Sequence, residues 1–274
     1  MSASVTANNN FSIDVPGGRL AAERWPGSGP TLVLLHASVA DRRAWTATAN
    51  ALAGTYAVVA YDRRGFGESP PSPEPFNHVE DLRAVLDTVA VERAWLVGSS
   101  AGGRVALDAA LSYPDRVSGL VLLAPAISGA PDFEADAETE ALFAQIDAAG
   151  DLAEVNRLEA RLWLDGPAGP EGRVGGPARE LFLAMNAIAL RAEAESPAGA
   201  GNSEIDVWSR LAEITVPVIV AWGELDIEVL NDRCRELVER LPAASGRELP
   251  HLAHLPDLED PGLVADLIRT AVAS

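Results

Sequence analysis

The sequence predicts an α/β fold, in which a mostly parallel β-sheet carries helices on both faces and is interrupted by a block of helices. Short apolar runs alternate with amphipathic helical segments through residues 19–123, as in a chain of βαβ units. Only helical patterns occur between about residues 131 and 205, and the alternation resumes at residue 216. The 274 residues, 48% hydrophobic and 22% charged, suit one such domain. We therefore divide the chain into a first core segment, a helical cap and a second core segment, at residues 1–130, 131–207 and 208–274.

Five strands and three helices are predicted in the first core segment. The run at 31–35 is almost wholly apolar, which is typical of a parallel strand that is covered on both faces. Gly54 ends the first helix, Asn77 caps the second and Pro114 stops the third. The strands are predicted at 19–25, 31–35, 56–61, 94–97 and 119–123, and the helices at 44–53, 78–89 and 103–112.

The cap is predicted to contain three helices, with a loop rich in Gly and Pro between the second and the third. The second core segment then adds a strand, a helix, a short strand and a closing helix. The cap helices are predicted at 133–149, 152–164 and 178–194, and the later elements at 216–222, 229–241, 247–249 and 263–272.

The composition narrows the classes of partner. A net charge of −19 and a pI near 4.5 argue against nucleic acid and against an anionic membrane surface, so we expect a small-molecule substrate. All 21 basic residues are Arg, which excludes chemistry that needs a Lys amine. Cys234 is the single cysteine, so no intrachain disulfide can form. Residues 1–10 do not resemble a signal peptide, and no apolar run reaches the roughly 18 residues that span a bilayer. We expect a cytoplasmic protein, whose oligomeric state the sequence does not indicate.

The segment 96–103 is predicted to place a serine on a sharp turn between a strand and a helix. It reads Leu-Val-Gly-Ser-Ser-Ala-Gly-Gly, a Gly-x-Ser-x-Gly pattern directly after an apolar run. Such a turn exposes one strained residue, and the neighbouring residues must be small because a larger Cβ would collide with the strand or the helix. Gly98, Ala101 and Gly102 meet this need, which makes Ser100 the candidate nucleophile. From these residues alone, a small-residue turn without chemistry remains the alternative.

A serine hydroxyl needs a base to take its proton, and the chain has four histidines. His251 and His254 lie after the last predicted strand, as the chain order Ser, acid, His requires. We favour His254, because the closing helix starts at a fixed distance after it, and keep His251 as the alternative. A carboxylate must orient the base, and the loop after strand 216–222 offers Asp226 first and Glu224 second.

Backbone N–H groups must stabilise the oxyanion of a tetrahedral intermediate. Ala101 should supply one N–H, because it follows the nucleophile. Ser38, in the loop after strand 31–35, should supply the other through its backbone.

The cap helices are expected to form the roof of the substrate pocket. Their apolar side chains imply a substrate with apolar bulk, although each of them could instead pack the cap against the core. Neither a metal nor an organic cofactor is needed for serine chemistry of this kind. The candidate pocket residues are His36, Val39, Phe143, Ile146, Trp163, Phe182 and Met185.

Together these segments resemble the α/β-hydrolase fold superfamily along the whole chain except the cap. Residues 62–69 are similar to its Asp-x-Arg-Gly-x-Gly-x-Ser loop, and His36-Ala37 stands where the superfamily has His-Gly. Its final Gly-His-x-x-x-x-Glu-x-Pro appears as Ala253-His254 followed by Glu259 and Pro261. The resemblance implies a mostly parallel eight-stranded sheet, an inserted helical cap, and a Ser100, His254 and Asp226 triad. The two Ala-for-Gly departures add methyl groups beside the oxyanion loop and the base.

Two core segments, 34–45 and 91–98, are similar to the 3-oxoadipate enol-lactonase group. This resemblance favours a serine hydrolase that cleaves a carboxylic ester or a lactone through an acyl-enzyme. Haloalkane dehalogenases and typical epoxide hydrolases are disfavoured, because they carry Asp where Ser100 stands. The alternatives are the same fold acting on another bond (C–C hydrolysis, peptide cleavage or perhydrolysis) and a non-catalytic ligand-binding homologue.

Overall fold

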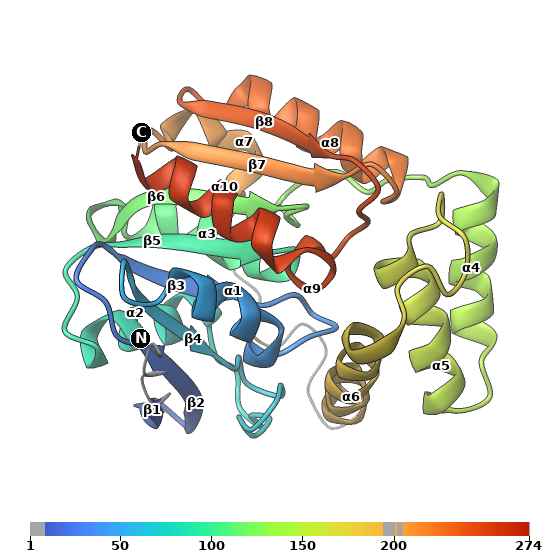
Figure 1. Cartoon of the computed structure of the whole chain (residues 1–274), viewed down its shortest axis with the longest axis horizontal. Helices are drawn as coiled ribbons and strands as arrows, with labels where there is room; N and C mark the ends of the chain where they lie inside the picture. The colour runs from blue at the N-terminus through green and yellow to red at the C-terminus, as the bar shows by residue number, and fades with distance from the viewer. Residues whose placement is uncertain (1–8, 194–200, 202–204, 274) are drawn as a thin grey trace, which may run out of the picture.

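The structure is a computed structural model that describes residues 9–193, 201 and 205–273. In this part of the chain eight strands form one sheet in the order β1-β2-β4-β3-β5-β6-β7-β8, so the predicted fold class is confirmed (Figure 1). β2 runs antiparallel to β1 and β4, and the pairs from β4 through β3 to β8 are parallel. The strands are β1 Asn9–Val15, β2 Gly18–Trp25, β3 Thr31–Leu35, β4 Ala57–Tyr61, β5 Ala94–Ser99, β6 Val117–Leu123, β7 Val218–Gly223 and β8 Ala244–Leu249.

The central strands are apolar throughout because both of their faces are buried. In β3, Val33 and Leu35 belong to one core cluster, whereas Leu32 and Leu34 belong to the cluster on the other face. β1 differs, because it lies at the edge of the sheet and alternates apolar with polar residues (Figure 1). No strand was predicted there, since its polar positions lack the continuous apolar pattern of the central strands.

Helices cover both faces of the sheet. α1 Thr46–Leu52 and α10 Pro261–Ala273 pack on one face, towards the viewer in Figure 1. α2 His78–Thr88, α3 Ala101–Ser112 and α8 Glu228–Arg240 pack on the other face. Short helical turns connect the main elements; they are η1 Arg42–Trp45, η2 Pro114–Arg116, α7 Val207–Arg210, η4 Leu211–Glu213 and α9 Pro256–Glu259.

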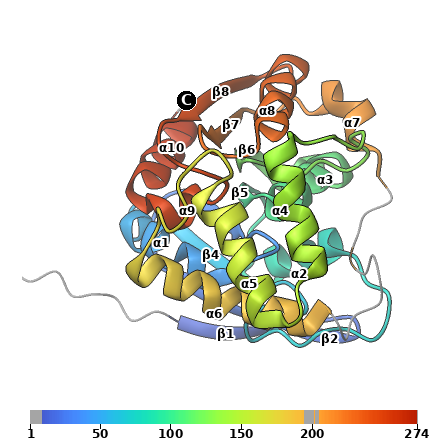
Figure 2. The same cartoon turned by 90° about the vertical axis from the view of Figure 1, so that its right-hand side faces the viewer.

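Helices that follow β6 along the chain lie beyond the carboxyl ends of the parallel strands (Figures 1 and 2). They are α4 Ala137–Ala148, α5 Leu152–Glu159 and α6 Gly176–Glu193, and the π-helical turn Ala160–Asp165 follows α5 directly. Asp136 and Asp151 cap the first two of them, so α4 begins four residues later than the pattern indicates. The last predicted residue of the third helix, Ala194, lies outside the described residues. In the described part of the chain, every helix is too short or too polar to cross a bilayer.

Candidate active site

A strained turn carries Ser100 between β5 and α3. Its backbone φ of 49° lies in the left-handed region, which residues other than glycine rarely adopt. The turn can form because its neighbours lack side chains; a Cβ on Gly98 would lie 2.5 Å from the Gly102 oxygen, and one on Gly102 would lie 2.1 Å from the Leu35 oxygen. The Ser100 N–H donates to the Leu123 oxygen at 2.9 Å, which ties the turn to β6.

His254 and Asp226 come together from the loops after β8 and β7. The Nδ1 of His254 lies 2.7 Å from Oδ2 of Asp226, and both side chains are buried. The second oxygen of Asp226 accepts the Ile227 N–H at 2.8 Å, which fixes the carboxylate. A carboxylate only accepts hydrogen bonds, so Nδ1 carries the hydrogen and Nε2 is left as the acceptor of the neutral ring.

The surroundings of His254 favour its charged form. Burial by itself would lower the pKa of His254, but the adjacent Asp226 carboxylate, helped by Asp257 and Glu259, raises this pKa above its usual value. The Trp163 ring lies against the imidazole, with 4.7 Å between ring centroids.

Asp257 is a buried carboxylate beside these groups. It accepts a hydrogen bond from Oγ of Ser99 at 3.0 Å, and its other oxygen has no partner among the described residues. Burial raises the pKa of Asp257 to about 6. Asp257 therefore joins the segment after His254 to the residue that precedes Ser100.

The two alternative residues, His251 and Glu224, lie on the surface. A Glu224 oxygen accepts the backbone N–H of His251 at 2.8 Å, and the His251 side chain is 91% exposed. Neither residue belongs to the lining of the cavity that contains Ser100. The geometry therefore favours Asp226 and His254 over this pair.

A cavity of about 470 Å³ opens beside Ser100 and His254. Its walls come from the turn that carries Ser100, the segment after β6, the π-helical turn after α5, the loop after β8 and one face of α8. Most of the lining is apolar, and Asp132 and Arg233 add charged groups. The lining residues are Ser100, Ala124, Pro125, Ala126, Ile127, Ala130, Pro131, Asp132, Phe133, Trp163, Leu230, Arg233 and His254.

Among the seven candidate pocket residues given above, Trp163 lines this cavity, and the structure places the other six elsewhere. Phe143 and Ile146 pack in a cluster around Ile227, and the Phe143 ring contacts Trp163 with 6.3 Å between centroids. The remaining apolar candidates, Val39, Phe182 and Met185, are buried in a separate cluster between α6 and the segments after β3 and β8. These side chains join the inserted helices to the core.

Residues 124–132, after β6, and the α8 side chains Leu230 and Arg233 were not predicted to line the pocket. A signal for the first was present in the sequence, because loops at the carboxyl ends of parallel strands form the ligand crevice of α/β sheets. Segment 124–133 follows such a strand. The pattern of α8 indicates an amphipathic helix but does not tell which residues reach a cavity.

The two predicted oxyanion donors lie in the loop after β3 and at the start of α3. Ser38 is exposed, and Ala101 is the first residue of α3. Within residues 9–193, 201 and 205–273, neither backbone N–H donates a hydrogen bond to a protein acceptor. Neither residue belongs to the lining of the cavity beside Ser100, and their role as oxyanion donors stays a prediction.

His36 holds the oxyanion loop and does not line the cavity as expected. Its Nε2 accepts the Arg63 N–H at 3.0 Å, so the hydrogen is on Nδ1, which donates to the Ala37 oxygen at 2.7 Å. Burial and the nearby Arg63 charge lower the pKa of His36 well below its usual value, so the ring stays neutral. The ring thus links the loop after β3 to the loop after β4.

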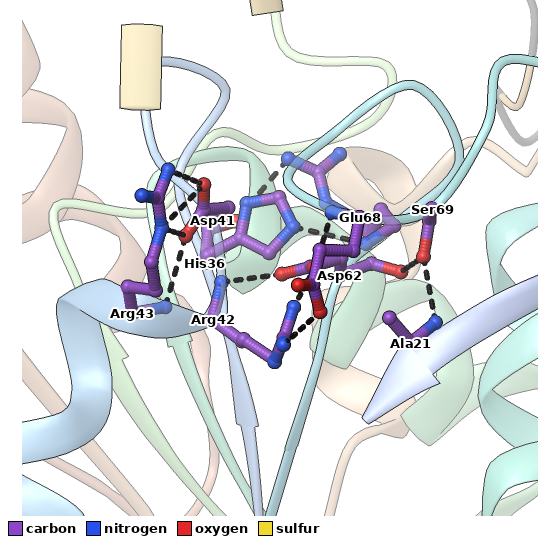
Figure 3. Close-up of polar contacts among 9 residues, drawn as sticks. Ala21, His36, Asp41, Arg42, Arg43, Asp62, Glu68 and Ser69 are labelled. Carbon is purple, nitrogen blue, oxygen red and sulfur yellow. Dashed lines mark hydrogen bonds and ion pairs between the residues drawn. The ribbon is translucent and has the colours of Figure 1, made fainter. Parts of the chain in front are cut away.

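Asp62 is the centre of the same network (Figure 3). Its carboxylate accepts the backbone N–H groups of Arg42 and Glu68, both at 2.8 Å, and pairs with the Arg42 guanidinium. Ser69 extends the network, because its Oγ donates to the Asp62 backbone oxygen at 2.8 Å and accepts the Ala21 N–H at 2.9 Å. The motif at 62–69 therefore fixes the loop that carries Ser38.

The described residues contain no group of three or more His, Cys, Asp or Glu side chains that could hold a metal ion. Cys234 is buried on α8, and burial raises the pKa of its thiol.

Comparisons with known proteins identify the family to which the chain is similar along most of its length. A family model described as "Alpha/beta hydrolase family" matches residues 32–267. The pimeloyl-[acyl-carrier protein] methyl ester esterase of Aeromonas hydrophila is 28% identical over 256 residues, 91% of this chain and 98% of that protein. The putative 2-succinyl-6-hydroxy-2,4-cyclohexadiene-1-carboxylate synthase of Bacillus subtilis is 28% identical over 266 residues, 92% and 94% of the two chains. A solved thermophilic esterase from Thermogutta terrifontis superposes with a TM-score of 0.77 at 25% identity, covering 97% of this chain and 98% of that chain.

Proposed function

The chain belongs to the alpha/beta hydrolase family, and we propose that it is a serine hydrolase that cleaves a carboxylic ester or a lactone through an acyl-enzyme. One observation carries the proposal: Ser100, on its strained turn, lines the same cavity as His254, whose ring is hydrogen-bonded to Asp226. The similar proteins from Aeromonas hydrophila and Thermogutta terrifontis are named esterases, which supports the choice of bond.

The first half of the reaction forms the acyl-enzyme. Oγ of Ser100 attacks the acyl carbon, and its proton passes to Nε2 of His254, which Asp226 keeps free of hydrogen. The backbone N–H groups of Ser38 and Ala101 stabilise the oxyanion that develops on the carbonyl oxygen. The intermediate collapses when the C–O bond of the leaving alcohol breaks and the imidazolium returns its proton to that oxygen.

The second half releases the acid. Water attacks the acyl carbon while His254 takes its proton, a second oxyanion forms, and Ser100 leaves with the proton returned. Both halves place a positive charge on His254, and the neighbouring carboxylates that raise the pKa of His254 stabilise that charge. Trp163 covers one side of the imidazole and limits the access of water from that side.

We propose that the inserted helices act as a cap over the cavity. Phe133, before α4, and Trp163, after α5, line the cavity and form part of its apolar wall. The substrate is therefore a small molecule with apolar bulk beside the scissile bond.

Ser100→Ala tests the proposal directly. The kcat for 4-nitrophenyl butyrate should fall by on the order of 10⁴ to 10⁶, because the nucleophile and its base act as one unit. Ser112→Ala is the matched control, since Ser112 is the last residue of α3, the helix that begins directly after Ser100. Its hydroxyl donates a hydrogen bond to the Asp108 backbone oxygen. Full turnover by Ser100→Ala would refute the proposal.

A further inference from the structure

One wall of the cavity carries a guanidinium group. Arg233 projects from α8 into the lining, half-buried, together with Leu230 from the same helix. Among the described lining residues, Arg233 is the one arginine, and the sequence contains no lysine that could supply a second cation of this kind.

Within the described residues, the contacts of Arg233 use one of its hydrogen-bond donors and include no anionic group. One terminal nitrogen donates to the Pro131 oxygen at 2.6 Å, and the guanidinium carbon lies 5.5 Å from the centroid of the Phe133 ring. No carboxylate of the described residues lies within ion-pair distance of Arg233. Arg235, two residues further along α8, pairs instead with three carboxylates, those of Glu228, Asp232 and Glu248.

The charge of Arg233 differs in sign from that of the protein as a whole. With a net charge of −19, the protein repels anions at long range. Asp132 borders the same cavity, but its side chain is exposed and makes no ion pair with Arg233 in the described structure. A guanidinium next to apolar walls therefore offers an incoming anion a local attraction that the outer surface does not.

We propose that Arg233 binds a carboxylate of the substrate, so that the natural substrate is an acidic ester or lactone with an anionic group away from the scissile bond. A guanidinium matches a carboxylate through two parallel N–H···O bonds, and its remaining donors can keep the Pro131 contact. The inference rests on the proposed function, since it assigns the substrate class of the Ser100 site. Arg233 acts as a specificity-determining residue in the lining of the same cavity.

The carboxylate could belong to the acyl group or to the alcohol, so the test has two arms. In the acyl arm, mono-4-nitrophenyl adipate is compared with the same ester of adipamic acid, its neutral carboxamide. In the alcohol arm, 3-(4-acetoxyphenyl)propanoate is compared with its carboxamide. For each pair, kcat/KM is measured in wild type, Arg233→Gln, Arg233→Lys and the matched control Arg235→Gln, with thermal unfolding to verify that each variant folds.

We expect the wild type to favour the anionic ester in one arm, and Arg233→Gln to reduce that preference on the order of 10- to 100-fold, as for a hydrogen bond to a charged group. Arg233→Lys should keep part of the preference because it keeps the charge, and Arg235→Gln should keep all of it. An unchanged ratio of anionic to neutral kcat/KM in Arg233→Gln, in both arms, would overturn the inference and leave the proposed function intact.

A failure of the proposed function has a different signature. If none of the four esters is turned over in a manner that Ser100→Ala abolishes, the hydrolase assignment is wrong. The carboxylate site is then tested by calorimetric binding of adipate to wild type and to Arg233→Gln. Binding that is lost in the variant supports the site, and equal binding by both proteins overturns it.

Discussion

Replacement of Asp226 by Asn should lower kcat about 10⁴-fold and change the fold little. The side chain is buried, with one oxygen 2.7 Å from Nδ1 of His254 and the other 2.8 Å from the Ile227 nitrogen. An amide has the same shape, but its NH₂ group can face Nδ1 and move the imidazole hydrogen to Nε2. An imidazole with hydrogen on Nε2 cannot accept the proton of Ser100. A 10⁴-fold loss corresponds to about 5.5 kcal/mol of transition-state stabilisation.

The pH profile of the same variant tests the electrostatic half of this reasoning. Burial lowers the pKa of His254, and the Asp226 carboxylate, together with Asp257 and Glu259, raises this pKa above its usual value. Because the base must be neutral, kcat/KM falls as the pH drops through the pKa of His254. This acidic limb should lie above about pH 6.5 in the wild type, the usual value for histidine, and at lower pH in Asp226→Asn.

The assay is hydrolysis of 4-nitrophenyl butyrate from pH 5 to pH 9, with Glu224→Gln as the matched control. Glu224 contacts the exposed His251 at the surface, so its replacement should leave kcat unchanged. Asp226→Asn activity within tenfold of wild type, or loss of activity in Glu224→Gln instead, would refute the role given to Asp226.

Two further predictions concern stability. Burial holds the pKa of Asp257 near 6, above the value of about 3.9 in an unfolded chain, so the folded state binds the extra proton and loses about 2 kcal/mol of stability as the pH rises from 4 to 7. Urea unfolding should show this loss in the wild type relative to Asp257→Asn, and a difference that does not vary with pH would contradict it. Gly102→Ala should destabilise the fold by at least about 2 kcal/mol, because the added Cβ would overlap the Leu35 backbone oxygen. Gly175→Ala is the control, since a Cβ at Gly175 would meet no other atom, and it should change the thermal midpoint little. Equal midpoints for the two alanine variants would argue against the close approach of β3 and α3.

The local patterns of the chain predict the fold and much of the geometry around Ser100. The turn at 98–102 depends on small residues next to one another, and the close contacts of Gly98 and Gly102 explain why each lacks a side chain. Asp226 and His254 are far apart in sequence. They meet because each follows a parallel strand, and the ends of neighbouring parallel strands share one edge of the sheet.

The pocket could not be predicted in the same way. The apolar pattern of a helix shows which of its residues are buried but not whether they face a cavity or another helix. Phe182 and Trp163 have similar sequence surroundings, yet Phe182 is buried in the contact between α6 and the core, whereas Trp163 lines the cavity. The sequence did not indicate that Arg233 lines the cavity, because only the packing of α8 distinguishes it from Arg235. Arg235 pairs with carboxylates at the surface, whereas Arg233 donates to the Pro131 backbone oxygen.

His36 shows a further limit. Its position after β3 suggested a place in the pocket, but both of its ring nitrogens are engaged by the Arg63 and Ala37 backbone. The partner loop lies 27 residues away, so no local pattern could reveal this pairing.

Mass spectrometry of a trapped acyl-enzyme is the most direct test of the central claim, that Ser100 forms a covalent bond with the acyl group of an ester. The protein is quenched in acid within milliseconds of mixing with 4-nitrophenyl butyrate and then digested. We predict a butyryl increment on the peptide that contains Ser100, absent in Ser100→Ala. An unmodified Ser100 peptide during steady turnover, or the increment on another residue, would contradict the account.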